Sequence, residues 1–478
     1  MKDSIKNHEN WELIAVIMFA KSTYIERRKT LKTKIGHGLI LFFGNELSPM
    51  NYTDNTYHFR QDSNFLYFFG IQRPGLSAFI DIDNDIEIIF GNEYTVEDYV
   101  WMGPQPTILD QAEKCGINRV MPTNKMADFI TKAKSSQQSI LFLPLYRPEN
   151  KIKLQELAGI APHEVATKFS VDLVRAVVQQ REFKTEEEII QINNAVDITV
   201  DMHTTAMQLA RPGMTEAQIT AEIHKIAIAA GGNLSFPIIA TINGQTLHNH
   251  YHGNVLKESD LLLIDAGYEN EMGYAGDLSS TFPVSQKFTS EQKEIYQLTL
   301  DAHAAAIEAL GLGVPFLNAH LAACSTIFDG LKSIGITKGN THDALAVGAH
   351  ALFFPCGTGH MMGLDVHDME DLGEVWVGYD GQPKSTQFGL KSLRLAKPLQ
   401  AGHVFTIEPG IYFIPELMDL WRSENKFDEF IHWNKLDRFR TFGGIRNEED
   451  FVMTENGAEI LGKPKPKTIT EIEFLRSQ

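Results

Sequence analysis

The chain has 478 residues and a formal net charge of -18, with 43% hydrophobic and 22% charged residues. This composition is typical of a globular protein large enough for two domains. The negative charge argues against binding to nucleic acid or to an anionic membrane surface. The three cysteines are too few and too scattered for a disulfide framework or a thiolate metal site, and they stand at Cys115, Cys324 and Cys356.

The first apolar segment, residues 13–20, is too short to cross a bilayer. Two lysines precede it as in a signal peptide, but Glu9 and Glu12 interrupt the positive region and no small-residue cleavage site follows. We therefore expect a cytoplasmic protein. Met18 is an alternative natural start, because a helical pattern follows it directly.

Strands and helices alternate over residues 18–173, which we take as the first domain. The alternation indicates a layered α/β unit. The expected helices cover residues 23–34, 109–115 and 125–134, and the expected strands cover residues 38–44, 65–69, 77–82, 86–90 and 139–144.

The second expected domain spans residues 174–465 and contains two similar helix pairs. Thr185 and Glu188 form a capping-box pattern that starts the first helix, and a second helix follows from Thr215. The pattern recurs after Ser290, which hints at an internal duplication. Strands flank each pair, so we expect an α+β domain whose antiparallel strands carry the chemical residues.

Several acidic residues lie where a carboxylate is costly. Asp265 ends the apolar run at residues 261–264, and Glu408 follows the run at residues 404–407, so both should emerge from buried strands. A buried carboxylate without a partner is penalised, and a bound cation reverses that preference. Any one of these acids could instead cap a strand or pair with a basic residue. A metal centre explains the whole group, which comprises Asp265, Asp277, His360, Glu408 and Glu448.

Oxygen-rich ligands with a single imidazole favour a hard divalent ion such as manganese, although cobalt or zinc would also be accepted. Five protein ligands are too many for one ion with open positions, so we expect two ions per chain joined by bridging carboxylates. Such a pair can share a hydroxide that attacks a carbonyl group. Glu449 and Asp450 lie beside Glu448 and compete with it as ligands on chemistry alone.

With these residues in place, the sequence resembles the aminopeptidase P and prolidase group of metallopeptidases from Met18 onward. The resemblance implies an α/β amino-terminal creatinase-like domain plus an α+β pita-bread catalytic domain. It also implies Glu448 as the ligand, because the family's glutamate stands two residues after an arginine. The matching segments are residues 59–67, 265–267, 273–283, 359–368, 406–410 and 444–448.

The resemblance implies roles for further residues. His248 lies 17 positions before Asp265, like the family's oxyanion-stabilising histidine, with His250 and His252 as alternatives. His367 is similar to the substrate-binding histidine, although a histidine in this position is often structural.

Arg446 and Tyr412 resemble residues that organise the substrate site, and Asp54 is expected to pair with Arg446 across the domain boundary. An ordinary domain-interface network is the alternative for these three. Trp101 resembles a tryptophan that reaches a neighbouring subunit, with core packing as the alternative. The resemblance further implies a homodimer or homotetramer.

One position departs from the family pattern. Cys356 stands where the family often has a histidine. A thiol is a weak hydrogen-bond donor and carries no imidazolium charge, so a substrate contact from this position is altered. As a thiolate it could instead bind a softer metal ion. We expect reduced or retuned activity, since all five ligand candidates are present.

The resulting hypothesis is a Xaa-Pro aminopeptidase, which cleaves peptides between an N-terminal residue and a following proline. Glu408 would then serve as both ligand and proton shuttle. The alternatives are a prolidase, which accepts only dipeptides, and a noncatalytic binding protein on the same scaffold. Relatives with this fold also hydrolyse creatine or organophosphate esters, so the fold alone does not fix the reaction.

Overall fold

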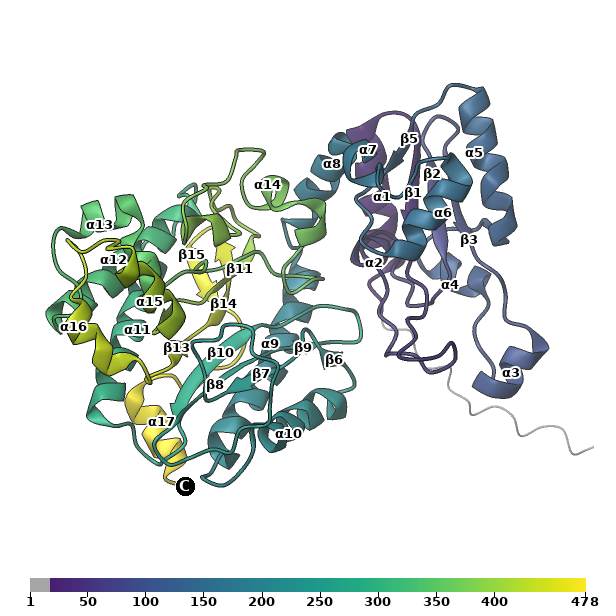
Figure 1. Cartoon of the computed structure of the whole chain (residues 1–478). Helices are drawn as coiled ribbons and strands as arrows, with labels where there is room; N and C mark the ends of the chain where they lie inside the picture. The colour runs from purple at the N-terminus through teal and green to yellow at the C-terminus, as the bar shows by residue number, and fades with distance from the viewer. Residues whose placement is uncertain (1–17) are drawn as a thin grey trace, which may run out of the picture. The chain divides into compact units, whose positions relative to one another are not determined.

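The computed structural model describes residues 18–478, which form two compact units, and the chain passes from the first to the second between Leu173 and Val174 (Figure 1). The expectations about a start at Met18 and about the apolar segment at residues 13–20 depend on residues 1–17, which lie outside the described residues. Within the described part, no helix combines the length and the hydrophobicity needed to span a bilayer.

Unit 1 contains a mixed five-stranded sheet with the order β4-β3-β2-β1-β5. Strand β1 pairs antiparallel with β2 and parallel with β5, and β3 pairs parallel with β4. The sheet and its helices confirm the predicted layered α/β unit. The strands are β1 (Leu39–Phe43), β2 (Ser77–Asp81), β3 (Ile86–Phe90), β4 (Val120–Met121) and β5 (Ile140–Phe142). The helices are α1 (Lys21–Ile35), α2 (Ser63–Phe69), α3 (Val96–Met102), α4 (Ile108–Lys114), α5 (Met126–Ser135), α6 (Pro148–Ala158) and α7 (Val165–Lys168).

The predicted strand at residues 65–69 is wrong, because this segment belongs to helix α2. The Asp62 side chain accepts a hydrogen bond from the Phe65 amide at 2.9 Å and so caps the helix, and Gly70 ends it in a left-handed conformation with φ 66°. Every side chain from Phe65 to Phe69 is buried. A short helix that is buried on all sides has no helical periodicity, and its aromatic run therefore reads as a strand.

Unit 2 is built around antiparallel strand pairs, as predicted. Three strands form the sheet β10-β8-β7 and three form the sheet β11-β14-β15, while β12-β13 and β6-β9 are two-stranded. The strands are β6 (Asn233–Leu234), β7 (Ile239–Thr241), β8 (Leu261–Ala266), β9 (Tyr268–Glu269), β10 (Leu278–Pro283), β11 (Val404–Ile407), β12 (Gly410–Tyr412), β13 (Gly444–Arg446), β14 (Glu449–Thr454) and β15 (Gly457–Ile460).

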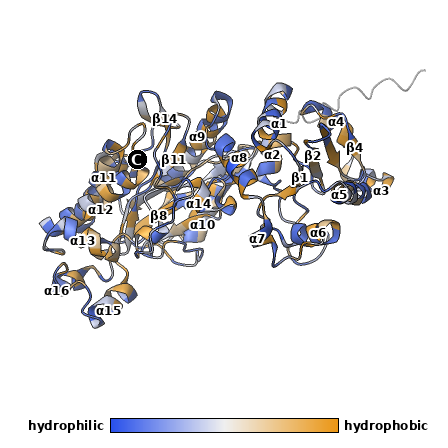
Figure 2. Cartoon of the chain, turned by 90° about the horizontal axis from the view of Figure 1, so that it is seen from above, coloured by the Kyte–Doolittle hydropathy of each residue, from blue (hydrophilic) through white to orange (hydrophobic). Residues whose placement is uncertain are grey.

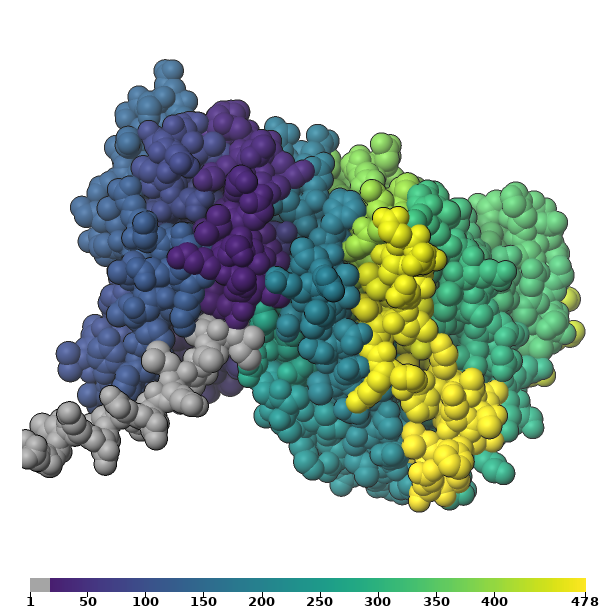
Figure 3. Space-filling view, turned by 180° about the vertical axis from the view of Figure 1, so that it is seen from behind, coloured from purple at the N-terminus to yellow at the C-terminus, as the bar shows by residue number. Residues whose placement is uncertain are grey.

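The two predicted helix pairs of unit 2 are present, and the capping boxes at Thr185 and Thr215 form as expected. Helix α8 leads into this unit, and the C-terminal segment lies across α9, where Arg476 donates to the Met207 carbonyl (Figure 3). Unit 2 thus continues to Gln478. Its helices are α8 (Val171–Arg181), α9 (Glu186–Leu209), α10 (Glu216–Ala229), α11 (Ser290–Glu308), α12 (Phe316–Ser333), α13 (Thr341–Val347), α14 (Glu374–Val377), α15 (Pro415–Ser423), α16 (Trp433–Leu436) and α17 (Ile469–Arg476).

Helix α3 of unit 1 contains hydrophobic residues, coloured orange in Figure 2. Several of their side chains are exposed to solvent. Trp101 and Val96 are each 80% exposed, and Val100 is 76% exposed. Trp101 is therefore not a core residue in this structure. An exposed aromatic and aliphatic group of this kind is typical of a surface that contacts another molecule.

Candidate active site

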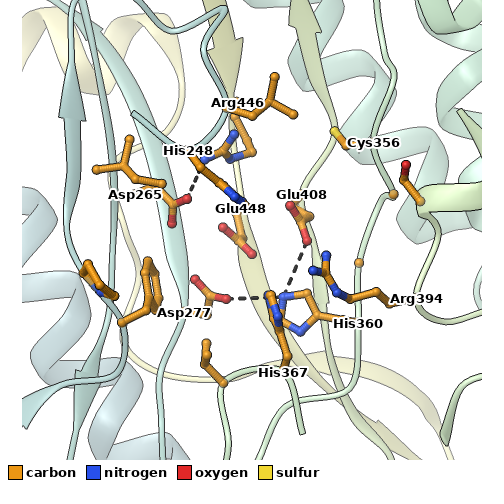
Figure 4. Close-up of a pocket in the computed structure, with 18 of the residues that line it drawn as sticks. His248, Asp265, Asp277, Cys356, His360, His367, Arg394, Glu408, Arg446 and Glu448 are labelled. Atoms are coloured by element: carbon orange, nitrogen blue, oxygen red, sulfur yellow. Dashed lines mark hydrogen bonds and ion pairs between the residues drawn. The ribbon is translucent and has the colours of Figure 1, made fainter. Parts of the chain in front are cut away.

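The strands of unit 2 bring the predicted ligand residues to one cavity. Asp265 lies near the end of β8, and Asp277 directly precedes β10, its antiparallel partner. Glu408 follows β11, and Glu448 lies between β13 and β14. The segment with His360 runs beside β11 through the bridge at the next residue. All five residues line a cavity of about 230 Å³ (Figure 4).

The side chains of the cavity are held in orientations that face one another. Nε2 of His360 lies 3.3 Å from the Asp277 carboxylate and 3.5 Å from the Glu408 carboxylate, while its Nδ1 donates to the Met361 carbonyl at 3.0 Å. This backbone contact leaves the Nε2 lone pair free to bind a metal ion. One donor atom each from Asp277, His360 and Glu448 lie within 4.8 Å of one another.

The ionisable side chains of the cavity suit a bound cation. Burial, followed by the neighbouring Asp265, raises the pKa of Asp277 to about 8. Burial also raises the pKa of Glu408 and of Glu448, and it lowers the pKa of His360 so that the imidazole is neutral. A neutral imidazole among crowded carboxylates is a donor set that fits divalent cations, because their charge offsets the repulsion.

The structure separates Glu448 from the two acids beside it. Glu448 lines the cavity and accepts a hydrogen bond from the Ser279 hydroxyl at 2.8 Å. Glu449 instead pairs with the Lys467 ammonium at 2.5 Å. Asp450 accepts the backbone N–H of Asp277 at 3.0 Å. Neither Glu449 nor Asp450 lines the cavity.

Two of the three candidate oxyanion histidines line the cavity. His248 and His250 are among the lining residues, whereas Nε2 of His252 contacts the Ile238 carbonyl at 3.1 Å. Burial, followed by the charge of Arg446, lowers the pKa of His248. A neutral imidazole can donate one N–H to a developing oxyanion.

His367 also lines the cavity, next to the histidine among the ligand candidates. Its ring centroid lies 4.3 Å from that of His360, and its Nδ1 is 2.6 Å from a Glu370 carboxylate oxygen. The carboxylate fixes the ring and leaves Nε2 available to a bound molecule.

Arg446 connects three parts of the site. Its guanidinium donates to the Asp265 carboxylate at 2.5 Å and to the Tyr412 hydroxyl at 3.1 Å. Cys356 lines the cavity and hydrogen-bonds with Tyr412, and burial raises the pKa of its thiol to about 12. Asp54 belongs to unit 1 and is exposed, and its pairing with Arg446 stays a prediction.

Arg394 lines the same cavity and was missed in the sequence (Figure 4). Its guanidinium lies 3.5 Å from the carboxylates of Glu370 and Glu374. No sequence motif surrounds this arginine, so only its position in the folded structure identifies it as a residue of the site. The apolar wall of the cavity was also missed, and it consists of Phe236, Pro237, Ile239, Leu247 and Val366.

Comparison with known proteins gives consistent results for both units. A model of metallopeptidase family M24 matches residues 190–455, and a model of the aminopeptidase P N-terminal domain matches residues 24–143. The chain is 30% identical to the Xaa-Pro dipeptidase of Homo sapiens, over 96% of this chain and 93% of that protein. It is 29% identical to the Xaa-Pro aminopeptidase of Escherichia coli K12, over 95% and 98% of the two chains.

A solved structure agrees with these matches. The aminopeptidase PepP of Pseudomonas aeruginosa superposes with a TM-score of 0.80 at 26% identity, and the match covers 96% of this chain and 99% of that one. The expected combination of a creatinase-like domain and a pita-bread domain is thereby confirmed.

Proposed function

The chain belongs to metallopeptidase family M24, and we propose that it is a Xaa-Pro aminopeptidase that releases the residue before proline from the N-terminus of a peptide. The observation that carries this proposal is one cavity lined by four carboxylates and four histidines, with an arginine against one carboxylate. Peptide bonds to proline resist general peptidases because the proline nitrogen has no hydrogen and the ring restrains the chain.

The proposed metal ligands are the five residues already described, and two divalent ions, manganese first, suit their oxygen-rich donor set. When bound, such a pair would supply Lewis acidity toward the scissile carbonyl and toward water. Thr406 donates from its hydroxyl to the Glu408 carboxylate at 3.4 Å, which helps to hold this side chain in place.

In the proposed mechanism the side chains move one proton and hold the substrate. Glu408 accepts the proton of the attacking water and delivers it to the departing proline nitrogen. His248 donates to the carbonyl oxygen as negative charge develops there. His367 holds the substrate near the scissile bond, and Glu370 fixes the orientation of its ring.

The experiment uses two peptides that differ only at the second residue. The manganese-loaded protein should release the first residue from Xaa-Pro-Xaa and leave Xaa-Ala-Xaa intact. Loss of this activity in Glu408→Ala would show that the cavity is the site of cleavage. A protein that binds metal but cleaves neither peptide would instead be the noncatalytic binding protein.

A second candidate, a prolidase that takes only dipeptides, is favoured by Arg394. A guanidinium beside the site can bind the free carboxylate of a Xaa-Pro dipeptide in a bidentate manner. The ion pairs of Arg394 with Glu370 and Glu374 hold it there. Cleavage of Xaa-Pro with no cleavage of Xaa-Pro-Xaa would identify a prolidase, and Arg394→Met should then weaken dipeptide binding.

We further propose that the protein is cytoplasmic and forms a homodimer or homotetramer. Its three cysteines are free thiols, which a reducing compartment preserves.

The exposed side chains of α3, including Trp101, suit a contact between copies of the chain. Light scattering on the wild type and on Trp101→Glu measures the oligomeric state. The same monomeric mass for both proteins would contradict the proposed dimer or tetramer.

A further inference from the structure

A second group of potential metal ligands lies inside unit 2. His320 and Cys324 are four residues apart on α12 and so share one face of that helix. His350 comes from a 3-10 helix, η2 (Ala349–Leu352). One donor atom from each of the three lies within 4.8 Å of the other two. His320 and Cys324 are 0% exposed, and His350 is 1% exposed.

The hydrogen bonds around this cluster leave ligand atoms without partners. Nδ1 of His320 contacts the Thr358 hydroxyl at 2.8 Å, which leaves its Nε2 facing the Cys324 sulfur at 3.5 Å. Among the described residues, neither ring nitrogen of His350 has a hydrogen-bond partner. A buried imidazole with two unsatisfied nitrogens is unfavourable, and coordination of an ion would satisfy one of them.

The distance between two of the candidate ligands fits a tetrahedral ion. Zinc binds sulfur at about 2.3 Å and imidazole nitrogen at about 2.05 Å, so two such ligands stand about 3.5 Å apart. This agrees with the distance between Cys324 and His320. We propose that His320, Cys324 and His350 bind one zinc ion, separate from the catalytic ions.

The ligand types distinguish the two metal centres. A thiolate with two imidazoles selects zinc over manganese, whereas the carboxylates of the cavity select harder ions. None of the three residues lines the catalytic cavity. Burial lowers the pKa of His320 to about 3 and that of His350 to about 4, so both are neutral and can donate a lone pair. Cys324 loses its proton to solvent when the ion binds.

The position of the zinc site indicates a structural role. The Thr358 hydroxyl contacts His320, and the Thr358 carbonyl accepts the backbone N–H of Glu408 at 2.8 Å. Thr358 also lies two residues before His360. An ion that joins α12 to η2 would therefore help to fix Thr358, which precedes His360 in the chain and contacts the backbone of Glu408.

The test counts ions in the full-length protein loaded with zinc and then dialysed. Cys324→Ala should hold one ion fewer per chain than the wild type. Cys115→Ala is the matched control, because Cys115 is equally buried but lies in unit 1. Cys356→Ala controls for the thiol in the catalytic cavity. Equal ion counts in the wild type and Cys324→Ala would overturn the proposal.

Cobalt gives a second readout that does not depend on activity, so this proposal and the proposed peptidase function can fail separately. The cobalt-loaded wild type, Cys115→Ala and Cys356→Ala should each show thiolate-to-cobalt charge-transfer absorption in the near ultraviolet. Cys324→Ala should lack it.

If Cys324→Ala does not fold, His350→Gln should hold one zinc ion fewer while its circular dichroism stays native. A cobalt band that persists without Cys324, or a full zinc count in His350→Gln, would refute the site.

Discussion

At the scale of single residues, the hydrogen-bond partners of each acid separate the candidate ligands from structural groups. Glu448 and Glu449 are neighbours in the chain, yet one faces the cavity and the other faces Lys467. Glu448 directly precedes strand β14, which begins at Glu449, and successive side chains of an extended segment point to opposite sides, which explains the difference. Chemistry alone left both open as ligands, and the family resemblance favoured Glu448.

This difference predicts opposite results for two matched substitutions. Glu448→Gln keeps the shape of the side chain but removes a negative charge from the proposed metal site. Its peptidase activity should fall by more than about a hundredfold, since supporting residues alone change metal affinity or activity by about 10–100-fold. Glu449→Gln should keep its metal and most of its activity. Metal analysis and peptide cleavage measure both, and equal losses in the two variants would contradict the assignment.

Cys356 provides a second prediction at this scale. Cys356→His introduces a stronger donor that can carry charge, next to Tyr412 in the cavity wall. One charge-assisted hydrogen bond of about 1.5 kcal/mol would raise turnover of Xaa-Pro peptides about tenfold. Cys356→Ser, which offers a small neutral donor, is the control and should turn over more slowly than Cys356→His. Turnover in Cys356→His at or below the wild-type rate would remove this cysteine as a limiting feature.

The sequence identified the residues that lie in motifs and missed those that do not. Asp265 and Glu408 follow apolar runs, so their place at strand ends could be predicted. Arg394 and His350 carry no such signal, because their surroundings come from segments far away in the chain. The count of cysteines likewise gave no indication that Cys324 lies beside two histidines.

At the scale of helices and strands, capping signals and periodicity were reliable where one face was exposed. The predicted helix starts at Thr185 and Thr215 both form capping boxes. The error at residues 65–69 arose where burial on every side removed the periodicity. Tertiary packing decides such segments, and the sequence does not show it.

Helix α9 and its sheet predict a sensitivity to acid. Nδ1 of His203 contacts the Ser280 hydroxyl and Nε2 contacts the Ala266 carbonyl, both at 3.0 Å. Burial, followed by the charge of Lys465, lowers the pKa of His203 to about 3. The unfolded chain therefore binds the proton first, and this part of the folding stability is lost as the pH falls from 6.5 toward 3. At pH 5 the loss amounts to about 2 kcal/mol.

Urea unfolding at pH 7 and pH 5 measures this effect. In His203→Gln, the decrease in unfolding free energy between the two pH values should be smaller than in the wild type by about 2 kcal/mol. His342→Gln is the control, because the His342 side chain is 92% exposed and its substitution should leave the decrease unchanged. An unchanged decrease in His203→Gln would show that His203 is not responsible.

At the scale of the whole molecule, unit 2 contains every residue that lines the catalytic cavity. The composition predicted two domains, and the motifs predicted which one carries the chemistry. The sequence could not assign a role to unit 1 in substrate binding, since the predicted pairing of Asp54 depends on how the two units meet. The net negative charge and the exposed face of α3 affect how the surface interacts with other molecules. They do not determine the fold.

The most direct test of the central claim is anomalous diffraction from a crystal soaked in manganese. We predict two peaks in the cavity, about 3.5–4 Å apart, as expected for a dinuclear site. They should lie among the five proposed ligands, which are Asp265, Asp277, His360, Glu408 and Glu448. A single peak there, or no peak while manganese binds elsewhere, would contradict a two-ion peptidase centre.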